Sequence, residues 1–481
     1  MRDLVRTSAY VGSTEIALVL VALVRNKYLA IHIGPEGFGV YGLLSSFFGL
    51  AAIFGGSWLS TGAMKYISEY NSEGKIDEVA KVFNFVYTLS FTLTTIVTFI
   101  LFVFHSFIKE YFLSPNILFV YYALFAASFI GSSLKSVFTS LLQGLLQIKK
   151  IVYLRLVTTL LEFLSVIILV YFFDLTGFFI SICISATFSA VLFYFSIRKI
   201  INSKIQIPKI RDAISSKLLK FGGISFFLGL INLLSAYLQR IIILSKLDII
   251  SVGFFQALNS IMNYLGILNR GSSFFFLPKM SENISVNERN KSLDEYIRFT
   301  LLTGIPGSIF TILFGKQVVQ LLYHTSFLEI SNFLFVFVLA QFVISIEMAY
   351  QGIIVGMAQL KIHSVATLIN HISWILIPLF LIKYYGLNSI GYGLIFGSII
   401  VILIQASYLK IKFSIGVSSK IYLILSMSIT FIFISLLFKD ARILTKIMIL
   451  LISLSFVLFI MTKNEMIDII AAVKRAFGFS N

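Results

Sequence analysis

The sequence predicts an all-α polytopic membrane protein, because apolar residues dominate it and long apolar runs recur from end to end. Hydrophobic residues make up 58% of the chain, charged residues only 12%, and the mean hydropathy is +0.96. A soluble domain carries roughly twice that share of charge. Apolar runs of about 18 residues or more are long enough to cross ~30 Å of hydrocarbon as helices. The alternating pattern of a membrane β-barrel is absent, so helices are expected throughout.

About fourteen transmembrane helices are expected. The first could be mistaken for a secretory signal, but Glu15 interrupts its apolar stretch and Arg25 stands where cleavage would fall. We therefore interpret it as an uncleaved span. The expected spans cover residues 8–33, 40–62, 82–107, 117–147, 151–173, 177–197, 220–246, 251–277, 299–322, 331–358, 363–384, 389–409, 420–438 and 443–461.

The distribution of basic residues between alternate loops predicts the orientation. Of the 38 lysines and arginines, 26 fall on the side that holds both termini and nine on the opposite side. Cytoplasmic loops carry the excess of Lys and Arg, so both termini are expected in the cytoplasm. The same asymmetry explains the net charge of +17 without nucleic acid, because basic residues are not interleaved with aromatic ones on a soluble face. The single cysteine excludes an internal disulfide and a cysteine-based metal site.

An internal repeat is visible at a nearly constant offset. Gly39 recurs as Gly253, and the Gly-x-x-Gln-x-Lys pattern around Gln147 recurs at almost the same spacing around Gln359. Transporters are often built from such repeats, and two copies with an even number of spans enter the membrane in the same direction. The sequence thus predicts two pseudo-symmetric six-helix lobes and two extra helices. The expected divisions are a lobe at 1–200, a basic cytoplasmic linker at 201–219, a second lobe at 220–412, and two further helices with a cytoplasmic tail at 413–481.

Ionisable residues inside the expected spans point to a water-filled interior. Each costs roughly 2.5–3.5 kcal/mol at the bilayer centre on insertion scales, so such residues usually face a cavity or a partner. Five of the eight are basic, which predicts a cationic cavity. They are Glu15, Arg25, Lys27, Lys135, Glu162, Arg240, Arg270 and Glu347.

Helical geometry selects among the basic residues. Arg25 and Lys27 lie about 200° apart on their helix, so they cannot face the same cavity. Arg25 has a repeat partner in Arg240, which favours Arg25 as the inward residue. On the eighth span, four polar residues share one face and end in an arginine. The expected substrate-binding residues are Arg25, Lys135, Arg240, Arg270, Gln256, Asn259 and Asn263.

Gating or ion coupling is the role expected for Glu15, Glu162, Glu347 and His371. Lys135 and Glu347 occupy repeat-equivalent positions, where they form either a structural ion pair or a gate that breaks during transport. Glu15 and Glu162 either neutralise basic neighbours or carry a coupling proton. For His371, packing is the favoured role. No metal or cofactor is expected, and H⁺ or Na⁺ coupling is left open.

Residues 34–41, Gly-Pro-Glu-Gly-Phe-Gly-Val-Tyr, resemble the L-G-P-x-x-F/Y-G-x-Y signature of polysaccharide-export flippases. An aromatic, Gly-rich second span and a cytoplasmic exit with Lys65 and Ser68-Glu69 are also similar to that family. The resemblance implies a Wzx-type flippase of the multidrug/oligosaccharidyl-lipid/polysaccharide exporter superfamily. Such proteins move undecaprenyl-diphosphate-linked O-antigen or capsule repeat units to the periplasmic leaflet. The family's cationic cavity would map onto Arg25, Lys135, Arg240 and Arg270.

The resemblance further implies a location in the bacterial inner membrane and no enzymatic activity. The expected partners are the undecaprenyl-diphosphate-linked oligosaccharide, the lipid bilayer, and a polysaccharide polymerase with chain-length proteins. Two transporter alternatives stay open: a lipid II flippase for peptidoglycan synthesis, and a multidrug and toxin extrusion exporter. A membrane glycosyltransferase or O-antigen polymerase would need sizeable loops outside the membrane, and the sequence has none.

Overall fold

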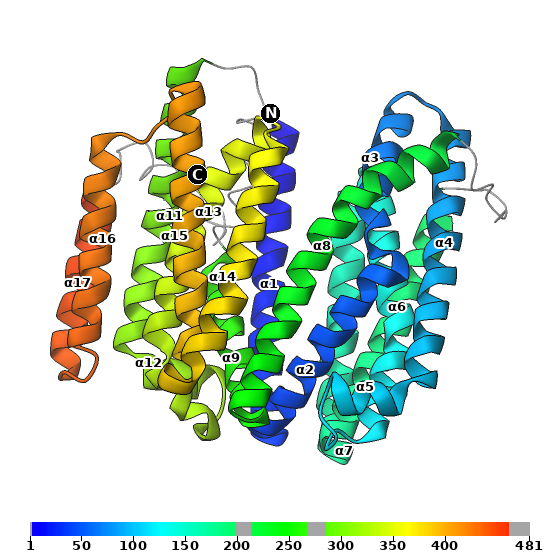
Figure 1. The fold of residues 1–481 in the computed structure, drawn as a ribbon, viewed down its shortest axis with the longest axis horizontal. Helices are drawn as coiled ribbons and strands as arrows, with labels where there is room; N and C mark the ends of the chain where they lie inside the picture. The colour runs from blue at the N-terminus through cyan, green and yellow to red at the C-terminus, as the bar shows by residue number, and fades with distance from the viewer. Residues whose placement is uncertain (1, 199, 201–212, 268–284, 461–481) are drawn as a thin grey trace, which may run out of the picture. The chain divides into compact units, whose positions relative to one another are not determined.

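The computed structural model describes residues 2–198, 200, 213–267 and 285–460, and these residues form helices joined by short connections (Figure 1). They divide into two compact units. The first consists of Met1–Gln256 and Leu321–Phe327, and the second of Ala257–Gln320 and Leu328–Asn481. Each unit is described separately below.

The first unit contains the helices of the first half of the chain and the start of the next one. Helices α6 and α7 pack along each other, as do α1 with α7 and α4 with α6 (Figure 1). Its helices are α1 (Arg2–His32), α2 (Gly34–Ala52), the π-helical turn η1 (Ile53–Ser57), α3 (Leu59–Ser72), α4 (Ile76–Val103), α5 (His105–Tyr111), α6 (Phe119–Gly144), α7 (Ile148–Arg198), α8 (Ala213–Lys246) and the first half of α9 (Ile249–Leu265).

The second unit holds the rest of α9 and the helices that follow it. Helices α14 and α15 pack together, α13 packs on α15, and α16 and α17 both contact α11 (Figure 1). The helices are α11 (Val286–Leu313), α12 (Gly315–Leu322), the 3₁₀ helix η2 (Thr325–Asn332), α13 (Leu334–Gly356), α14 (Leu360–Tyr385), α15 (Asn388–Phe413), α16 (Ser419–Leu437) and α17 (Ile443–Ile460). The unit boundary runs through α12 and η2, because Leu321–Phe327 belongs to the first unit.

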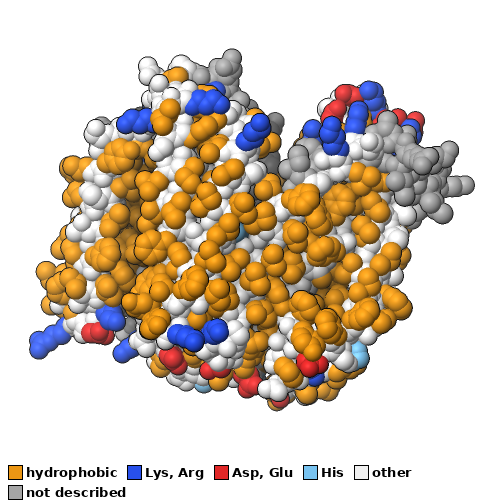
Figure 2. Space-filling view, in the orientation of Figure 1, with side chains coloured by type: hydrophobic (Ala, Val, Ile, Leu, Met, Phe, Trp, Pro, Cys, Tyr) orange, Lys and Arg blue, Asp and Glu red, His pale blue; other side chains and the backbone are white. Residues whose placement is uncertain are grey.

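The helices carry the surface expected of membrane spans. Ten helices in the described part of the chain are long and apolar enough to cross a bilayer, and two shorter apolar helices accompany them. Figure 2 shows hydrophobic side chains over the middle of the helices, with Lys, Arg, Asp and Glu gathered near the helix ends. An all-helical multi-pass membrane protein is therefore confirmed, whereas the count of fourteen spans stays a prediction.

The structure bears out one expected boundary and corrects another. The element α7 consists of two helices that meet at Asp174, where φ is 45° and ψ is −128°, and this is where the sequence separates spans 151–173 and 177–197. The expected span 40–62 is interrupted by η1, in which Gly56 has φ of 91°. Most residues of the signature at 34–41 form the first turns of α2, and only the chain reversal at Gly34, with φ of 60°, is a turn. Local hydropathy did not reveal η1, because the π-helical turn interrupts the regular helix without interrupting the apolar run.

Paired backbone features support the internal repeat. Leu146 and Ala358 both have φ of 56°, and each ends a helix with the same two hydrogen bonds, one reaching back five residues and one reaching back three. This is the Schellman motif, and here it occurs at repeat-equivalent positions. Asp174 and Gly386 are separated by the same number of residues as Leu146 and Ala358. Both have a positive φ, of 45° and 52°. The same chain geometry thus recurs at the spacing that the sequence pattern predicts.

The compact units do not coincide with the predicted lobes. The first unit extends to Gln256, so α8 and the start of α9 lie with residues 1–198, and α8 packs against α2, α3 and α4. Close approach of backbones holds the start of α9 against α2. A Cβ atom on Gly39 of α2 would stand 2.0 Å from the carbonyl oxygen of Ile249, and one on Gly253 of α9 would stand 1.9 Å from that of Pro35. The lobe boundaries at 1–200 and 220–412 stay predictions.

Glycine at position 131 is required for the packing of α6 against α7. A Cβ atom there would lie 2.7 Å from the carbonyl carbon of Ala186 and 2.9 Å from the amide nitrogen of Thr187, which are backbone atoms that cannot rotate away. Gly131→Ala is therefore expected to destabilise the protein by about 1–3 kcal/mol through overpacking. The measurement is the thermal-unfolding midpoint of the purified protein in detergent.

The matched control is Gly223→Ala on α8, where an added Cβ meets no atom within 4 Å. That change is expected to leave the midpoint unchanged or to raise it, because alanine favours a helix by about 1 kcal/mol over glycine. Equal midpoints for the two variants would contradict the packing role of Gly131.

Candidate functional site: a cationic cluster in the first unit

Arg25 and Glu162 form an ion pair between two membrane helices. Arg25 lies on α1 and Glu162 on the first half of α7, and Nη1 of Arg25 donates a hydrogen bond to Oε1 of Glu162. Their side chains are 25% and 28% exposed, so the pair is half-buried. The sequence interpretation offered Glu162 as a neutraliser of basic neighbours, and the structure supplies such a neighbour.

Two further helices bring polar groups to this ion pair. Lys135 on α6 lies within electrostatic range of Glu162 and of Arg155. Tyr41 on α2 lies within electrostatic range of Arg25, Glu162 and Arg240. Two consecutive helices, α1 and α2, and the later pair α6 and α7 therefore contribute to one polar region.

Arg240 is the most deeply buried of the basic residues considered. It lies on α8 and its side chain is only 7% exposed. Its Nη1 donates to the carbonyl oxygen of Ala236 at 2.9 Å, and its Nη2 donates to Oε1 of Gln256 at 2.7 Å. The guanidinium carbon stands 5.3 Å from the ring centre of Phe255, at cation–π distance. Nε has no hydrogen-bond partner among the described residues.

These residues form what we call the cationic cluster: Arg25, Tyr41, Lys135, Glu162, Arg240 and Gln256. All of them belong to the first unit. Three positive side chains are grouped with one carboxylate, so the cluster carries a net positive charge. Burial of such groups away from water is costly unless anions compensate them, and the cluster therefore favours an anionic ligand.

Some of the expected site residues lie elsewhere or outside the described residues. Asn259 and Asn263 are on α9 beyond the unit boundary, where Asn259 is half-buried and Asn263 is exposed. Arg270 falls outside the described residues, and so does the side chain of Glu15 on α1.

The acidic and histidine residues of the second unit lie in a buried polar region. Glu347 on α13 is 6% exposed, and both of its carboxylate oxygens accept hydrogen bonds from Nδ2 of Asn370 on α14, at 3.0 and 3.2 Å. His371 is buried with its ring packed edge-on against Trp374. Lys135 and Glu347 thus each have a neighbour in their own unit, and their pairing across the two units stays a prediction.

Two residues of these regions escaped the sequence interpretation. Tyr41 was quoted only as the last residue of the signature, although a phenol within an expected span was a signal for a polar role. Asn370 precedes His371, and an amide in an apolar span next to a histidine was equally visible. The sequence alone could not predict the partners of Tyr41 and Asn370, because the rotation of each helix about its axis depends on packing against other helices.

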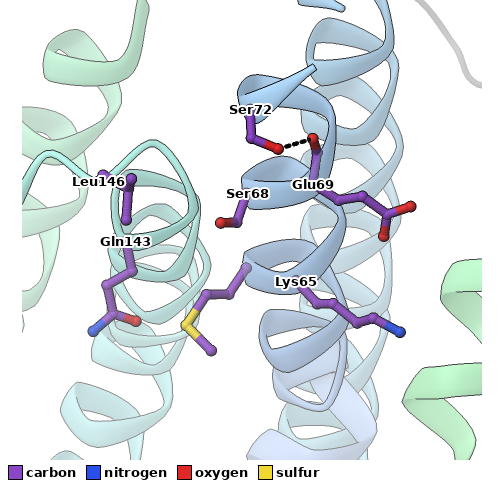
Figure 3. Close-up of a pocket in the computed structure, with 7 residues that line it drawn as sticks. Lys65, Ser68, Glu69, Ser72, Gln143 and Leu146 are labelled. Carbon is purple, nitrogen blue, oxygen red and sulfur yellow. Dashed lines mark hydrogen bonds between the residues drawn. The ribbon is translucent and has the colours of Figure 1, made fainter. Parts of the chain in front are cut away.

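A pocket of about 610 Å³ lies apart from these residues, between α3 and the end of α6 (Figure 3). Ser68 extends from α3 toward the α6 side, whereas Lys65 and Glu69 extend from the other side of α3 (Figure 3). Ser72 donates to the carbonyl oxygen of Glu69 at 2.7 Å. Because its charged side chains are turned away from Gln143 on α6, this pocket does not match an anionic ligand as the cationic cluster does.

A sequence profile for the polysaccharide biosynthesis protein family matches residues 4–286, which is more than half of the chain. The chain belongs to this family. The matched region includes every member of the cationic cluster. No curated protein matches the chain.

Solved structures of similar fold come from the multidrug/oligosaccharidyl-lipid/polysaccharide exporter superfamily. An inward-facing multidrug resistance transporter of the MATE family is 13% identical with a TM-score of 0.71, covering 85% of this chain and 96% of that one. The lipid II flippase MurJ in an inward closed conformation is 17% identical with a TM-score of 0.71, covering 93% and 98%. A superfamily transporter from Pyrococcus furiosus, described as having a binding pocket of reversed polarity, is 13% identical with a TM-score of 0.56, covering 85% and 94%. This member of the polysaccharide biosynthesis family thus has the fold of these transporters.

The half-buried pair Arg25–Glu162 is expected to couple more strongly than an exposed ion pair. A double-mutant cycle with Arg25→Gln and Glu162→Gln should give a coupling free energy of about 1–3 kcal/mol, because each single change leaves a charged group of the membrane interior without its partner. The measurement is the free energy of unfolding in SDS for the wild type, both single variants and the double variant.

The control cycle uses the exposed pair Lys81–Glu78, whose Nζ–Oε1 distance is 3.0 Å at the start of α4. There we expect about 0.5 kcal/mol or less. A coupling for Arg25–Glu162 no larger than that of the control would show that the ion pair does not stabilise the fold.

Proposed function

We propose that this protein flips undecaprenyl-diphosphate-linked oligosaccharide repeat units, of O-antigen or capsule, from the cytoplasmic to the periplasmic leaflet by alternating access. The observation that carries this proposal is the cationic cluster: Arg25 pairs with Glu162, Lys135 lies within electrostatic range of that carboxylate, and Tyr41 lies within electrostatic range of both Arg25 and Arg240. Membership of the polysaccharide biosynthesis family supplies the pathway in which such an anionic cargo occurs.

A diphosphate is the part of this substrate that matches the cluster. The planar guanidinium fork of arginine binds phosphate oxygens in pairs, and lysine adds a compact positive charge. Arg240 is already held in place by Gln256 and Ala236, so little rotamer freedom remains to be lost on binding. The amide side chains of Gln256, Asn259 and Asn263 on α9 would then hydrogen-bond the sugar hydroxyls, and Arg270 would add a further positive charge for the diphosphate.

Two other transporter functions share the fold. A lipid II flippase would carry a diphosphate as well, so the cluster suits it equally and only the family match favours polysaccharide units. A multidrug exporter that carries cations would be disfavoured, because three positive side chains in the membrane interior repel such a cargo. The cluster therefore argues against that alternative on electrostatic grounds.

The location and partners of this proposal follow from the cargo. We place the protein in the bacterial inner membrane with both termini in the cytoplasm, as the excess of basic residues on that side predicts. After flipping, the repeat unit would pass to a polysaccharide polymerase and its chain-length proteins.

Loss of a cluster cation is expected to abolish export. In a strain that lacks the chromosomal gene, Arg240→Ala and Arg25→Ala should reduce surface polysaccharide by at least tenfold, because the diphosphate loses a charge-assisted bidentate contact. Lys135→Ala and Arg270→Ala should reduce surface polysaccharide by the same factor as the two arginine variants or by a smaller one. The measurement is surface polysaccharide by gel or antibody, with membrane insertion checked by immunoblot.

The control is Lys75→Ala, which removes one positive charge from an exposed connection where Lys75 pairs with Glu73. Wild-type polysaccharide is expected from this variant. Full export by both arginine variants would remove the cluster from the transport path, and with it the observation on which the proposed function rests.

Glu347 is the residue that we propose for ion coupling, with His371 and Glu15 as further members of the coupling or gating set. Its burial and its hydrogen bonds from Asn370 support this role, because a carboxylate sealed among helices changes its interactions when it gains a proton or a cation. In proteoliposomes, Glu347→Gln is expected to make flipping insensitive to an imposed ion gradient, whereas Glu347→Asp should stay sensitive. A Glu347→Gln variant that responds to the gradient as the wild type does would exclude the role.

A further inference from the structure

Glu162 occupies an unusual position, since it is a carboxylate at the centre of an otherwise cationic cluster. It accepts a hydrogen bond from Arg25, lies within electrostatic range of Lys135, and lies within electrostatic range of Tyr41. A site that served only to attract anions would be stronger without this carboxylate. Its presence therefore calls for a reason beyond affinity.

Exposure shows that the ion pair is open to exchange. Arg25 and Glu162 are each about a quarter exposed, whereas Arg240 is 7% exposed and is held by Gln256 and Ala236. The arginine that an incoming anion reaches first is thus the one that already has an anionic partner. A ligand that takes Nη1 of Arg25 must displace Glu162.

The outcome of this exchange depends on the charge of the ligand. A ligand with one negative charge replaces one carboxylate contact by one phosphate contact, so it gains little. A diphosphate diester carries two negative charges, and its second phosphate can contact Lys135 or Arg240 while the first takes Arg25. Only the second kind of ligand gains a net ionic interaction.

We propose that Glu162 is a selectivity residue: as the built-in counter-ion of Arg25, it rejects lipids with a single phosphate charge and yields only to a diphosphate headgroup. The inference rests on the proposed function and adds a reason for the carboxylate. Most phospholipids of the surrounding bilayer carry one phosphate charge each and vastly outnumber the substrate. Discrimination against an abundant competitor needs a repulsive element, and Glu162 supplies it.

The test compares two lipids that differ by one phosphate: a polyprenyl diphosphate linked to a hexose, and the polyprenyl monophosphate linked to the same hexose. Binding to the purified full-length protein in phosphatidylcholine nanodiscs gives the ratio of the two dissociation constants. For the wild type we expect at least tenfold tighter binding of the diphosphate-linked sugar. For Glu162→Gln the preference should fall at least fivefold, mainly because the monophosphate-linked sugar binds more tightly.

Three further variants separate charge from structure. Glu162→Asp retains the carboxylate and should keep the wild-type preference. Glu162→Asn provides a second neutral side chain in case Glu162→Gln is not monodisperse on gel filtration, and it should lose the preference. Glu78→Gln, which breaks the exposed ion pair with Lys81, is the matched neutralisation outside the cluster and should change nothing.

Different results would contradict the selectivity role of Glu162 and the proposed function. If both neutral variants keep the wild-type preference while Arg240→Ala weakens binding of the diphosphate-linked sugar, the selectivity role is wrong, Glu162 is a structural ion-pair partner, and the proposed function stands. If the wild type shows no binding of the diphosphate-linked sugar, the proposed function itself fails. A preference lost equally in Glu162→Asp would also refute the counter-ion explanation, because the charge is still present there.

Discussion

The cost of placing positive charge inside an apolar helical protein is the constraint on which the candidate site depends. Insertion scales put it at roughly 2.5–3.5 kcal/mol for each such residue at the bilayer centre. In the first unit this cost is offset in two different ways. Arg25 is neutralised by Glu162, whereas Arg240 is held by a carbonyl oxygen, an amide oxygen and an aromatic face. The first arrangement involves a formal anion that a ligand can replace, and in the second no carboxylate of the described residues pairs with Arg240.

Close packing of helices gives these charges their positions. Gly39 and Gly253 let α2 and the start of α9 approach to backbone contact, and a Cβ atom on Gly42 would stand 3.2 Å from Oε1 of Gln256. The amide that orients Arg240 is thus itself fixed against α2, the helix that carries Tyr41. Small residues have this role in membrane proteins because lipid provides no hydrophobic drive, so that van der Waals contact and hydrogen bonds must hold helices together. The geometry of the cluster follows from glycine positions that carry no charge.

The second unit contributes a different kind of polar region. Glu347 and Asn370 join α13 to α14 through a carboxylate–amide interaction, and within the described ranges no basic side chain forms an ion pair with Glu347. One unit thus holds basic residues around an acid, and the other holds an acid among neutral polar groups. The backbone repeat, seen in the matching helix ends at Leu146 and Ala358, shows that similar chain paths carry this dissimilar chemistry.

The amino-acid sequence determined the all-helical membrane architecture, the internal repeat and the set of embedded charges, because the preference of a segment for lipid is a local property of its residues. It also marked Arg25 and Arg240 as related, and offered Glu162 either as a neutraliser or as a carrier of a coupling proton, since a buried charge requires compensation wherever it lies. Only the tertiary structure decided which neutraliser meets which cation: Arg25 and Glu162 are 137 residues apart, and their meeting depends on the rotation of α1 and α7 about their axes. The π-helical turn before Trp58 and the grouping of α8 with the first unit were likewise decided by packing. Hydropathy counts how much apolar surface a helix has, whereas contacts between helices fix the direction in which each surface faces.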